Sequence, residues 1–239
     1  MSVSDFPSRG NAHTPIPLAA SAAGLSLWWC TLSPPGETLS AIRATLSPEE
    51  TERAARFGTE ALRRRYIAGR AALRFTLGGV LGLDPAAVPI RRGPRGRPIL
   101  GPPHGLDFNV THTEGVGVIA HLARPGWRVG VDVESLARNV SHDGLARKFL
   151  TARERTAIAR LDDDARRGAF LRRWTCKEAM SKATGDGLSA PFREIGIDVS
   201  GGFVVSEGRG AYAPARWTLE PVALSSDLVA TVALWAPES

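Results

Sequence analysis

Residues 129–134, VGVDVE, place two acidic side chains in a segment that otherwise has the pattern of a buried β-strand. Valines alternate with Gly130, Asp132 and Glu134. This period of two directs the valines to one face of the strand and both carboxylates to the other. Because neighbouring like charges repel, that second face needs water or a cation. A solvated edge strand is the simpler interpretation, but two carboxylates on one face also suit Mg²⁺, which prefers oxygen ligands.

The second motif that could carry chemistry is WTCKEAMSK, residues 174–182, in a segment with helical periodicity. At about 100° per residue, Trp174, Glu178 and Lys182 share one side of the helix, opposite an apolar packing face. Only three of the 30 lysines and arginines in the chain are lysines, and two of them, Lys177 and Lys182, lie in this motif. Because lysine is a compact charge with a tunable pKa, the motif indicates a need for an ammonium group. An exposed ion pair between Glu178 and Lys182 is the alternative.

Three further segments carry side chains that suit phosphate groups. FNVTHT, residues 108–113, places His112 beside Thr111 just before a turn. RRRYIAGR (63–70) and RRGPRGRP (91–98) add arginines, which can contact phosphates through two parallel hydrogen bonds. The alternatives are a structural histidine and solvated arginines.

Composition limits the class of protein. The 239 residues are 43% hydrophobic and 23% charged, which fits one large globular domain or two small lobes. No run of about 18 apolar residues is present, so no membrane span is predicted. Residues 1–20, with three prolines, are predicted to be a disordered leader. Two cysteines, Cys30 and Cys176, are too few for a zinc cluster or a disulfide framework, so a cytoplasmic location is expected.

The net charge of +6 favours an anionic partner. Nucleic acid, a phosphorylated ligand and an acidic protein all satisfy this condition, so the charge alone does not choose among them.

The order of predicted elements, strands followed by helices and then strands, indicates an α+β fold. Local signals set the boundaries, including a capping box at Ser47 and Glu50 and glycines after the helices. The first half is predicted to contain a strand at 25–32, two helices within 46–82 and a hairpin over 105–123. The second of these helices is predicted to run from Thr59 to Leu77 and to stop at Gly78-Gly79. The second half is predicted to contain the strand 129–134, two helical segments over 141–184, of which the second starts at Asp163 or Asp164, and strands within 201–236.

In order and spacing, these motifs resemble the 4′-phosphopantetheinyl transferases of the larger, surfactin-synthetase-activating type. The combination G-V/I-D-x-E and W-x-x-K-E-A/S-x-x-K is diagnostic of that family, and it is present at residues 130–134 and 174–182. The resemblance covers about residues 45–235. The matching motifs are GRAALR, GPRGRPIL, FNVTHT, VGVDVE, FLTARE and RRWTCKEAMSKATGDGL.

Such enzymes move phosphopantetheine from coenzyme A (CoA) onto a serine of an apo acyl or peptidyl carrier protein and release 3′,5′-ADP. The resemblance implies that Asp132, Glu134 and Glu178 hold Mg²⁺ against the CoA pyrophosphate, where positioning and charge neutralisation carry the catalysis. It implies that Lys182 stabilises the leaving 3′,5′-ADP, with Lys177 as a second cation. The other CoA contacts that it implies are Arg65, Arg70, Arg97, Thr111, His112 and Asp132.

The serine hydroxyl needs a general base. Glu178 is the first candidate, Glu154 in the motif TARE is the second, and a metal-bound water is the third. Coordination to Mg²⁺ would lower the pKa of Glu178, so the choice stays open at this point.

The resemblance also implies two similar α+β lobes related by a pseudo-twofold axis, with CoA in the cleft between them. The expected lobes are residues 21–125 and 126–239, and because one chain supplies both, a monomer is expected. The acidic helix of the carrier is expected to contact basic surface of this chain. The sequence does not identify which carrier protein is the native one. The chain departs from the family at Thr111, where serine is usual, and at Arg97, where lysine is common.

Two other functions stay open from the sequence. A CoA-binding module without catalysis would share the phosphate contacts but would not need Glu178. A nucleic-acid-binding protein would explain the charge, but it would explain neither the two acids of VGVDVE nor the lysines beside an acid.

Overall fold

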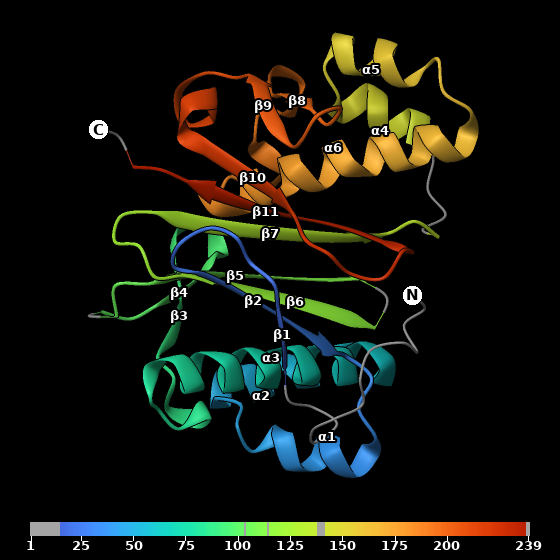
Figure 1. Cartoon of the computed structure of the whole chain (residues 1–239). Coiled ribbons are helices and arrows are strands. Elements are labelled where there is room, and N and C mark those ends of the chain that lie inside the picture. Colours follow the sequence, from blue (N-terminus) through green and yellow to red (C-terminus); the bar gives the residue numbers. More distant parts are fainter. Residues whose placement is uncertain (1–14, 103, 114, 138–141, 238–239) are drawn as a thin grey trace.

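Figure 1 shows the computed structural model, which describes residues 15–102, 104–113, 115–137 and 142–237. The helices are α1 (Gly36–Arg43), α2 (Pro48–Ala55), α3 (Glu60–Leu81), α4 (His142–Phe149), α5 (Ala152–Ile158) and α6 (Asp163–Thr184). The strands are β1 (Ile16–Leu18), β2 (Leu25–Thr31), β3 (Ile90–Arg92), β4 (Pro98–Leu100), β5 (Asp107–Thr113), β6 (Val116–Leu122), β7 (Arg128–Ser135), β8 (Gly196–Asp198), β9 (Val204–Glu207), β10 (Trp217–Pro221) and β11 (Leu228–Trp235). The predicted α+β class is confirmed.

Two antiparallel sheets lie between two long helices (Figure 1). The first sheet has the strand order β1-β2-β6-β5 and is covered by α3, and the second has the order β10-β11-β7 and is covered by α6. Apolar side chains from both sheets form one shared core. Each half of the chain therefore combines a sheet with one helix of 22 residues. The lobe boundary near Pro125 stays a prediction.

The alternation in β7 produces the two faces that its sequence predicts. Val129, Val131 and Val133 are buried in the core between the sheets. The opposite face is not solvated, since Asp132 and Glu134 are only 5% and 9% exposed. The interpretation of a solvated face is therefore wrong, because α6 covers the face on which these acids lie.

Gly130 allows β7 and α6 to meet backbone against backbone. A Cβ atom at this position would overlap the carbonyl oxygen of Ala179 and lie 2.8 Å from the amide nitrogen of Ala183. Only glycine fits this approach, so the first letter of the G-V-D-V-E motif sets how closely the helix lies over the acids.

β7 is the edge strand of its sheet, and side chains satisfy its outer backbone groups. The amide of Val129 donates to the carboxylate of Asp107 (2.8 Å), and the amide of Val131 donates to the side-chain oxygen of Asn109 (3.0 Å). Both acceptors belong to β5, the edge strand of the other sheet. The two sheets are thus joined along these edges by side-chain hydrogen bonds.

The helix α3 extends beyond the predicted stop at Gly78-Gly79. It ends at Leu81, and Gly82 adopts the left-handed conformation (φ +66°) that closes many helices. Gly78 instead provides space, because a Cβ atom there would lie 2.8 Å from the carbonyl oxygen of Leu83. The predicted capping box of Ser47 and Glu50 at the start of α2 is confirmed.

The segment 141–184 contains three helices within its described residues, where two were predicted. The additional helix is α5, which begins at a second capping box formed by Thr151 and Glu154. The last helix, α6, begins one residue after Asp162, the N-cap, and ends before Gly185 as expected. Two short helices were therefore merged into one because the motif TARE was not taken as a helix start.

The predicted leader, residues 1–20, overlaps the first sheet. Ile16–Leu18 pairs with β2, so this part of the prediction is wrong, whereas residues 1–14 lie outside the described part. The predicted hairpin over 105–123 is confirmed as β5 and β6. Within the described ranges, no helix has the length and apolar character that crossing a bilayer requires.

The two thiols provide a test of the core. Cys30 and Cys176 are buried, and burial raises the pKa of each thiol to about 12. Because the thiolate is the reactive form, we expect neither cysteine to react with Ellman's reagent at pH 8 in the folded protein and both to react in guanidinium chloride. The released thionitrobenzoate is measured by absorbance. Fast labelling of either thiol without denaturant would contradict this burial.

Candidate active site

Asp132 lies at the centre of a polar cluster on the face of β7 that α6 covers. Its Oδ1 atom accepts from the ammonium group of Lys182 (2.6 Å) and from the hydroxyl of Thr111 (3.1 Å) on β5. Its Oδ2 atom is buried and has no hydrogen-bond partner among the described residues. Burial raises the pKa of Asp132, and the charge of Lys182 opposes this rise. The cluster therefore contains a buried carboxylate oxygen that is open to a further ligand.

Lys182 joins the two sheets at this point. Besides Asp132, its ammonium group donates to the hydroxyl of Thr111 (3.0 Å) and to the carbonyl oxygen of Val131 (3.2 Å). Its side chain is still 26% exposed, so the charge lies at the edge of the cluster and can be reached by a ligand.

Glu134 is the second acid on the same face, and its charge adds to the rise in the pKa of Asp132. Its Oε1 atom accepts from the indole nitrogen of Trp174 on α6 (3.2 Å). Glu178 lies one helical turn from both Trp174 and Lys182 and is half-buried. Thus Trp174 and Lys182, two of the three residues predicted to share one side of this helix, contact the two acids.

The predicted metal set of three carboxylates is not assembled in this arrangement. Within the described residues, no three His, Cys, Asp or Glu side chains form a group that could hold a metal ion. The structure brings Asp132 and Glu134 together on β7, whereas Glu178 comes separately from α6.

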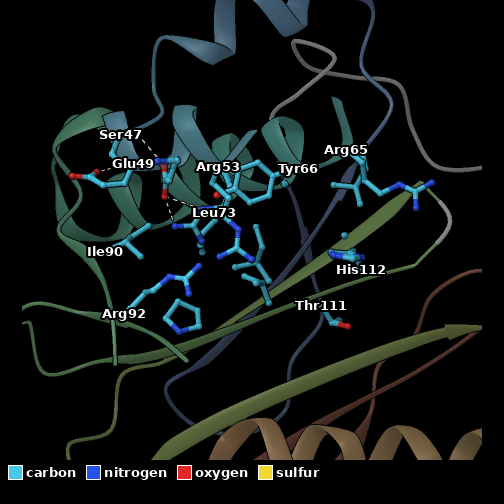
Figure 2. A pocket seen from close by; sticks show the side chains of 18 of the residues that line it. Ser47, Glu49, Arg53, Arg65, Tyr66, Leu73, Ile90, Arg92, Thr111 and His112 are labelled. Carbon is cyan, nitrogen blue, oxygen red and sulfur yellow. Dashed lines mark hydrogen bonds and ion pairs between the residues drawn. The ribbon is translucent and has the colours of Figure 1, made fainter. Parts of the chain in front are cut away.

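A pocket of about 1090 Å³ opens beside this cluster, lined by α2, α3, β3 and the strands β5 and β6 (Figure 2). Thr111 and His112 line it from β5, and Arg65 lies near His112 at one end, with Arg92 toward the other. Thr111 also donates to Asp132, so one residue of the pocket wall contacts the acid cluster. The arginines that line it are Arg53, Arg56, Arg65, Arg70, Arg91 and Arg92.

His112 reports the charge at this end of the pocket. Its pKa is lowered, first by burial and then by the positive charges of Lys182 and Arg65. A side chain that already has two cations nearby gains its proton only at a cost, unless an anion is bound. The end of the pocket is therefore suited to an anionic group.

Two arginines predicted to contact CoA have protein partners. Arg70 lines the pocket but forms an ion pair with Glu50, which also accepts from Arg74 (2.6 Å). Arg97 is buried, and it donates to both carboxylate oxygens of Asp107 (2.8 and 2.6 Å). These pairings neutralise both arginines before any ligand binds.

Arg97 also donates to the backbone carbonyl groups of Phe108 (3.2 Å), Val129 (2.9 Å) and Lys182 (2.9 Å). Its guanidinium thus holds β5, β7 and α6 together. We correct its predicted role as a CoA contact, because its hydrogen-bonding capacity is used inside the protein.

Lys177 and Glu154 are also placed away from the cluster. Lys177 is completely buried and forms an ion pair with Glu154 (2.7 Å), which is 4% exposed. Glu154 also accepts from the backbone amides of Thr151 (2.7 Å) and Ile197 (2.8 Å). The predictions of Lys177 as a phosphate contact and Glu154 as a general base do not fit this geometry.

Sequence reasoning missed four arginines of the pocket and the partner of Glu134. Arg91 and Arg92 lie in RRGPRGRP, the segment from which Arg97 was chosen. In the structure they differ from Arg97 because they are exposed on β3 whereas Arg97 is buried. Arg53 and Arg56 lie in and just after α2, where helical spacing alone did not single them out. Trp174 was noted for its position, but its hydrogen bond had no signal in the sequence.

Comparisons with known proteins identify the family of the chain. Residues 128–233 match the model of the 4′-phosphopantetheinyl transferase superfamily, and residues 30–124 match that of the 4′-phosphopantetheinyl transferase N-terminal region. The chain belongs to the 4′-phosphopantetheinyl transferase family and is a transferase.

Individual relatives extend over most of the chain. It is 37% identical to the 4′-phosphopantetheinyl transferase HetI of Nostoc sp., over 95% of this chain and 97% of that protein. It is 25% identical to the 4′-phosphopantetheinyl transferase of Bacillus subtilis, over 64% of this chain and 66% of that protein. The holo-[acyl-carrier-protein] synthase of Thermotoga maritima aligns with a TM-score of 0.38 and 21% identity, over 46% of this chain and 64% of that structure.

The corrected role of Arg97 leads to a stability prediction. Arg97→Met would remove a buried guanidinium and leave the partly buried carboxylate of Asp107 without its partner, and breaking a buried pair costs up to about 3–5 kcal/mol. We expect the free energy of unfolding, measured in urea, to fall by about that amount. The matched control is Arg92→Met, an exposed arginine of the same hairpin, with an expected change within about 0.5 kcal/mol. Equal effects of the two variants would contradict the structural role.

Proposed function

We propose that the chain transfers the 4′-phosphopantetheine group of CoA to a serine of an apo carrier protein, with Mg²⁺ as the metal and 3′,5′-ADP as the product. One observation carries the proposal: Thr111 belongs both to the arginine-lined pocket and to the cluster of Asp132 and Lys182. If CoA binds with its phosphates in that pocket, its diphosphate would therefore lie within reach of the acids.

The pocket favours CoA as the donor. Its volume of about 1090 Å³ lies just above the usual range for small-molecule sites, which leaves room for a ligand as large as CoA. Arg65 and His112 bring cationic or proton-accepting groups to the end nearest the cluster, and arginine suits bidentate contact with phosphate. Arg70, held by Glu50, would shape the wall without adding a free charge.

The acids of β7 fit Mg²⁺. Asp132 offers a buried oxygen that has no partner in the described part of the chain, and Glu134 supplies a second carboxylate on the same face. Mg²⁺ usually binds one or two carboxylates together with water and substrate phosphates, so two acids are enough. When bound, the ion would neutralise charge on the diphosphate. Asp132 and Glu134 would hold it.

The side chains around the cluster account for the transfer. The serine oxygen attacks the phosphorus next to pantetheine, and the bond between that phosphorus and the oxygen of 3′,5′-ADP breaks. Lys182 stabilises the negative charge that the leaving group gains. Glu178 accepts the serine proton. It is half-buried and lies one helical turn from Lys182, whereas the other candidate base, Glu154, is held in an ion pair with Lys177.

The proposed partner is an acidic acyl or peptidyl carrier protein. The net charge of +6 favours such a partner through electrostatic attraction. Residues of β5, β7 and α6 from one chain form the cluster, so the proposal needs no second copy and includes a monomer. The nucleic-acid alternative shares the support of the net charge, but it does not explain two buried acids on β7, one of them paired with Lys182.

The direct test is intact-mass measurement of an apo carrier after incubation with CoA and Mg²⁺. We expect the carrier to gain the mass of one phosphopantetheine group, and we expect the gain to vanish with EDTA or with Asp132→Ala. Asp164→Ala, an exposed acid at the start of α6, is the matched control and should behave as the unmodified chain. CoA binding without a mass gain on several apo carriers would instead support a non-catalytic CoA-binding module.

Lys182 should affect the rate more than the binding of CoA. Lys182→Ala removes the charge that stabilises the leaving group, and a loss of one such group lowers kcat by about 10²- to 10³-fold. Initial rates at saturating CoA measure this change. An unchanged kcat with a raised KM would show that Lys182 serves only in binding.

His112 should report the bound phosphate. Its pKa is lowered by burial and by Lys182 and Arg65, so in the free protein it should titrate below the usual value of about 6.5. A bound anion stabilises the imidazolium, so 3′,5′-ADP should raise this pKa and should bind more tightly as the pH falls. NMR titration with and without 3′,5′-ADP measures the shift, and His112→Gln assigns the resonance. A pKa unaffected by 3′,5′-ADP would place the phosphates elsewhere.

A further inference from the structure

The ion pair of Lys177 and Glu154 has no part in the proposed reaction, yet it is the most deeply buried pair of charges described. Lys177 is completely buried, and its ammonium group donates to Glu154 (2.7 Å) and to the carbonyl oxygens of Phe149 (3.0 Å) and Phe192 (2.9 Å). A buried pair of this kind is often no more stabilising than apolar packing. What this pair does achieve is to fix the backbone at two phenylalanines that are distant in sequence.

The rings of these two phenylalanines contact one indole. The ring centroid of Phe149 lies 4.5 Å from that of Trp174, and the centroid of Phe192 lies 5.6 Å from it. Phe170, one turn earlier on α6, stacks on the indole with an interplanar angle of 9°. Three aromatic rings therefore surround Trp174 and restrict its rotation.

The indole held in this way presents its N–H group to the active-site cluster. Its nitrogen donates to Oε1 of Glu134 at 3.2 Å, and both side chains are about 9% exposed. A buried indole can only donate, and it usually finds one partner. A phenylalanine at position 174 could also pack against these aromatic rings. Only the N–H group of Trp174, which donates to Glu134, would be lost with phenylalanine.

We propose that Trp174 is a positioning residue that orients the Glu134 carboxylate toward the metal. In this proposal the pair of Lys177 and Glu154 fixes Trp174 through Phe149 and Phe192. The proposal rests on the proposed function, because it takes Glu134 as a metal ligand. Hydrogen bonds to the side chains that bind a metal commonly change its affinity by roughly 10- to 100-fold.

The test compares Trp174→Phe with Trp217→Phe. Trp174→Phe keeps an aromatic ring but removes the N–H group. Trp217 also donates an indole hydrogen bond, to the carbonyl oxygen of Ala211 (2.9 Å), and it packs against Tyr212 and Trp235 instead of the cluster. Trp217→Phe is therefore the matched control. Each protein is titrated with Mn²⁺, alone and with CoA, and the free ion is measured by electron paramagnetic resonance.

We expect Trp174→Phe to weaken Mn²⁺ binding by roughly 10- to 100-fold and Trp217→Phe to leave it unchanged. Thermal unfolding of both variants measures stability separately. Equal Mn²⁺ affinity in Trp174→Phe and the unmodified chain would overturn the positioning role and leave the proposed function intact. No Mn²⁺ binding by the unmodified chain, even with CoA, would overturn both.

A measurement on the unmodified chain covers the case in which Trp174→Phe does not fold. In a ¹H–¹⁵N spectrum, the Nε1–H resonance of Trp174 should shift when Mg²⁺ and CoA are added, while that of Trp217 should not. Phe192→Leu removes one ring but keeps the indole N–H, and it should increase hydrogen exchange at Trp174. A Trp174 resonance that does not respond to Mg²⁺ and CoA would contradict the proposal.

Discussion

The outer edge of β7 is the constraint on which the rest of the structure depends. Among the described strands none pairs with its backbone on that side, and buried amides and carbonyls without partners are costly. Four side chains supply the missing partners: Asp107, Asn109, Arg97 and Lys182. They come from β5, from the end of the β3–β4 hairpin and from α6. Satisfying one strand edge thus fixes the sheets and α6 against each other, and it places a lysine beside Asp132.

The same constraint determines which cations remain for a ligand. Arg97 and Lys177 are used within the protein, and Arg70 is neutralised by Glu50. Lys182 takes part in both tasks, because it binds Val131 and Asp132 yet keeps part of its surface exposed. At the end of the pocket where His112 lies, Lys182 and Arg65 are therefore the cations whose charge His112 experiences.

Local sequence signals predicted much of the fold. The features that they did not predict depend on contacts between residues that are distant in sequence. The valine alternation of β7 and the capping box at Ser47 predicted real elements because both depend on neighbours in sequence. Gly78 was taken as a helix stop, but its role depends on the later passage of Leu83. Within the site, the acids of VGVDVE were recognised, whereas Arg97 was assigned to CoA because its true partner, Asp107, lies on another strand. Burial of Lys177 depends likewise on segments far along the chain.

The contact at Gly130 has a consequence for how the active site can evolve. Where side chains separate two elements, substitutions of different size can adjust their distance. Here the helix backbone at Ala179 and Ala183 rests directly on the strand, and atoms in contact cannot be compressed further. The distance between α6 and β7 is therefore already at its minimum, and no side-chain substitution can make it shorter. Variation in substrate choice is left to the pocket walls, while the spacing between acids and lysine stays the same.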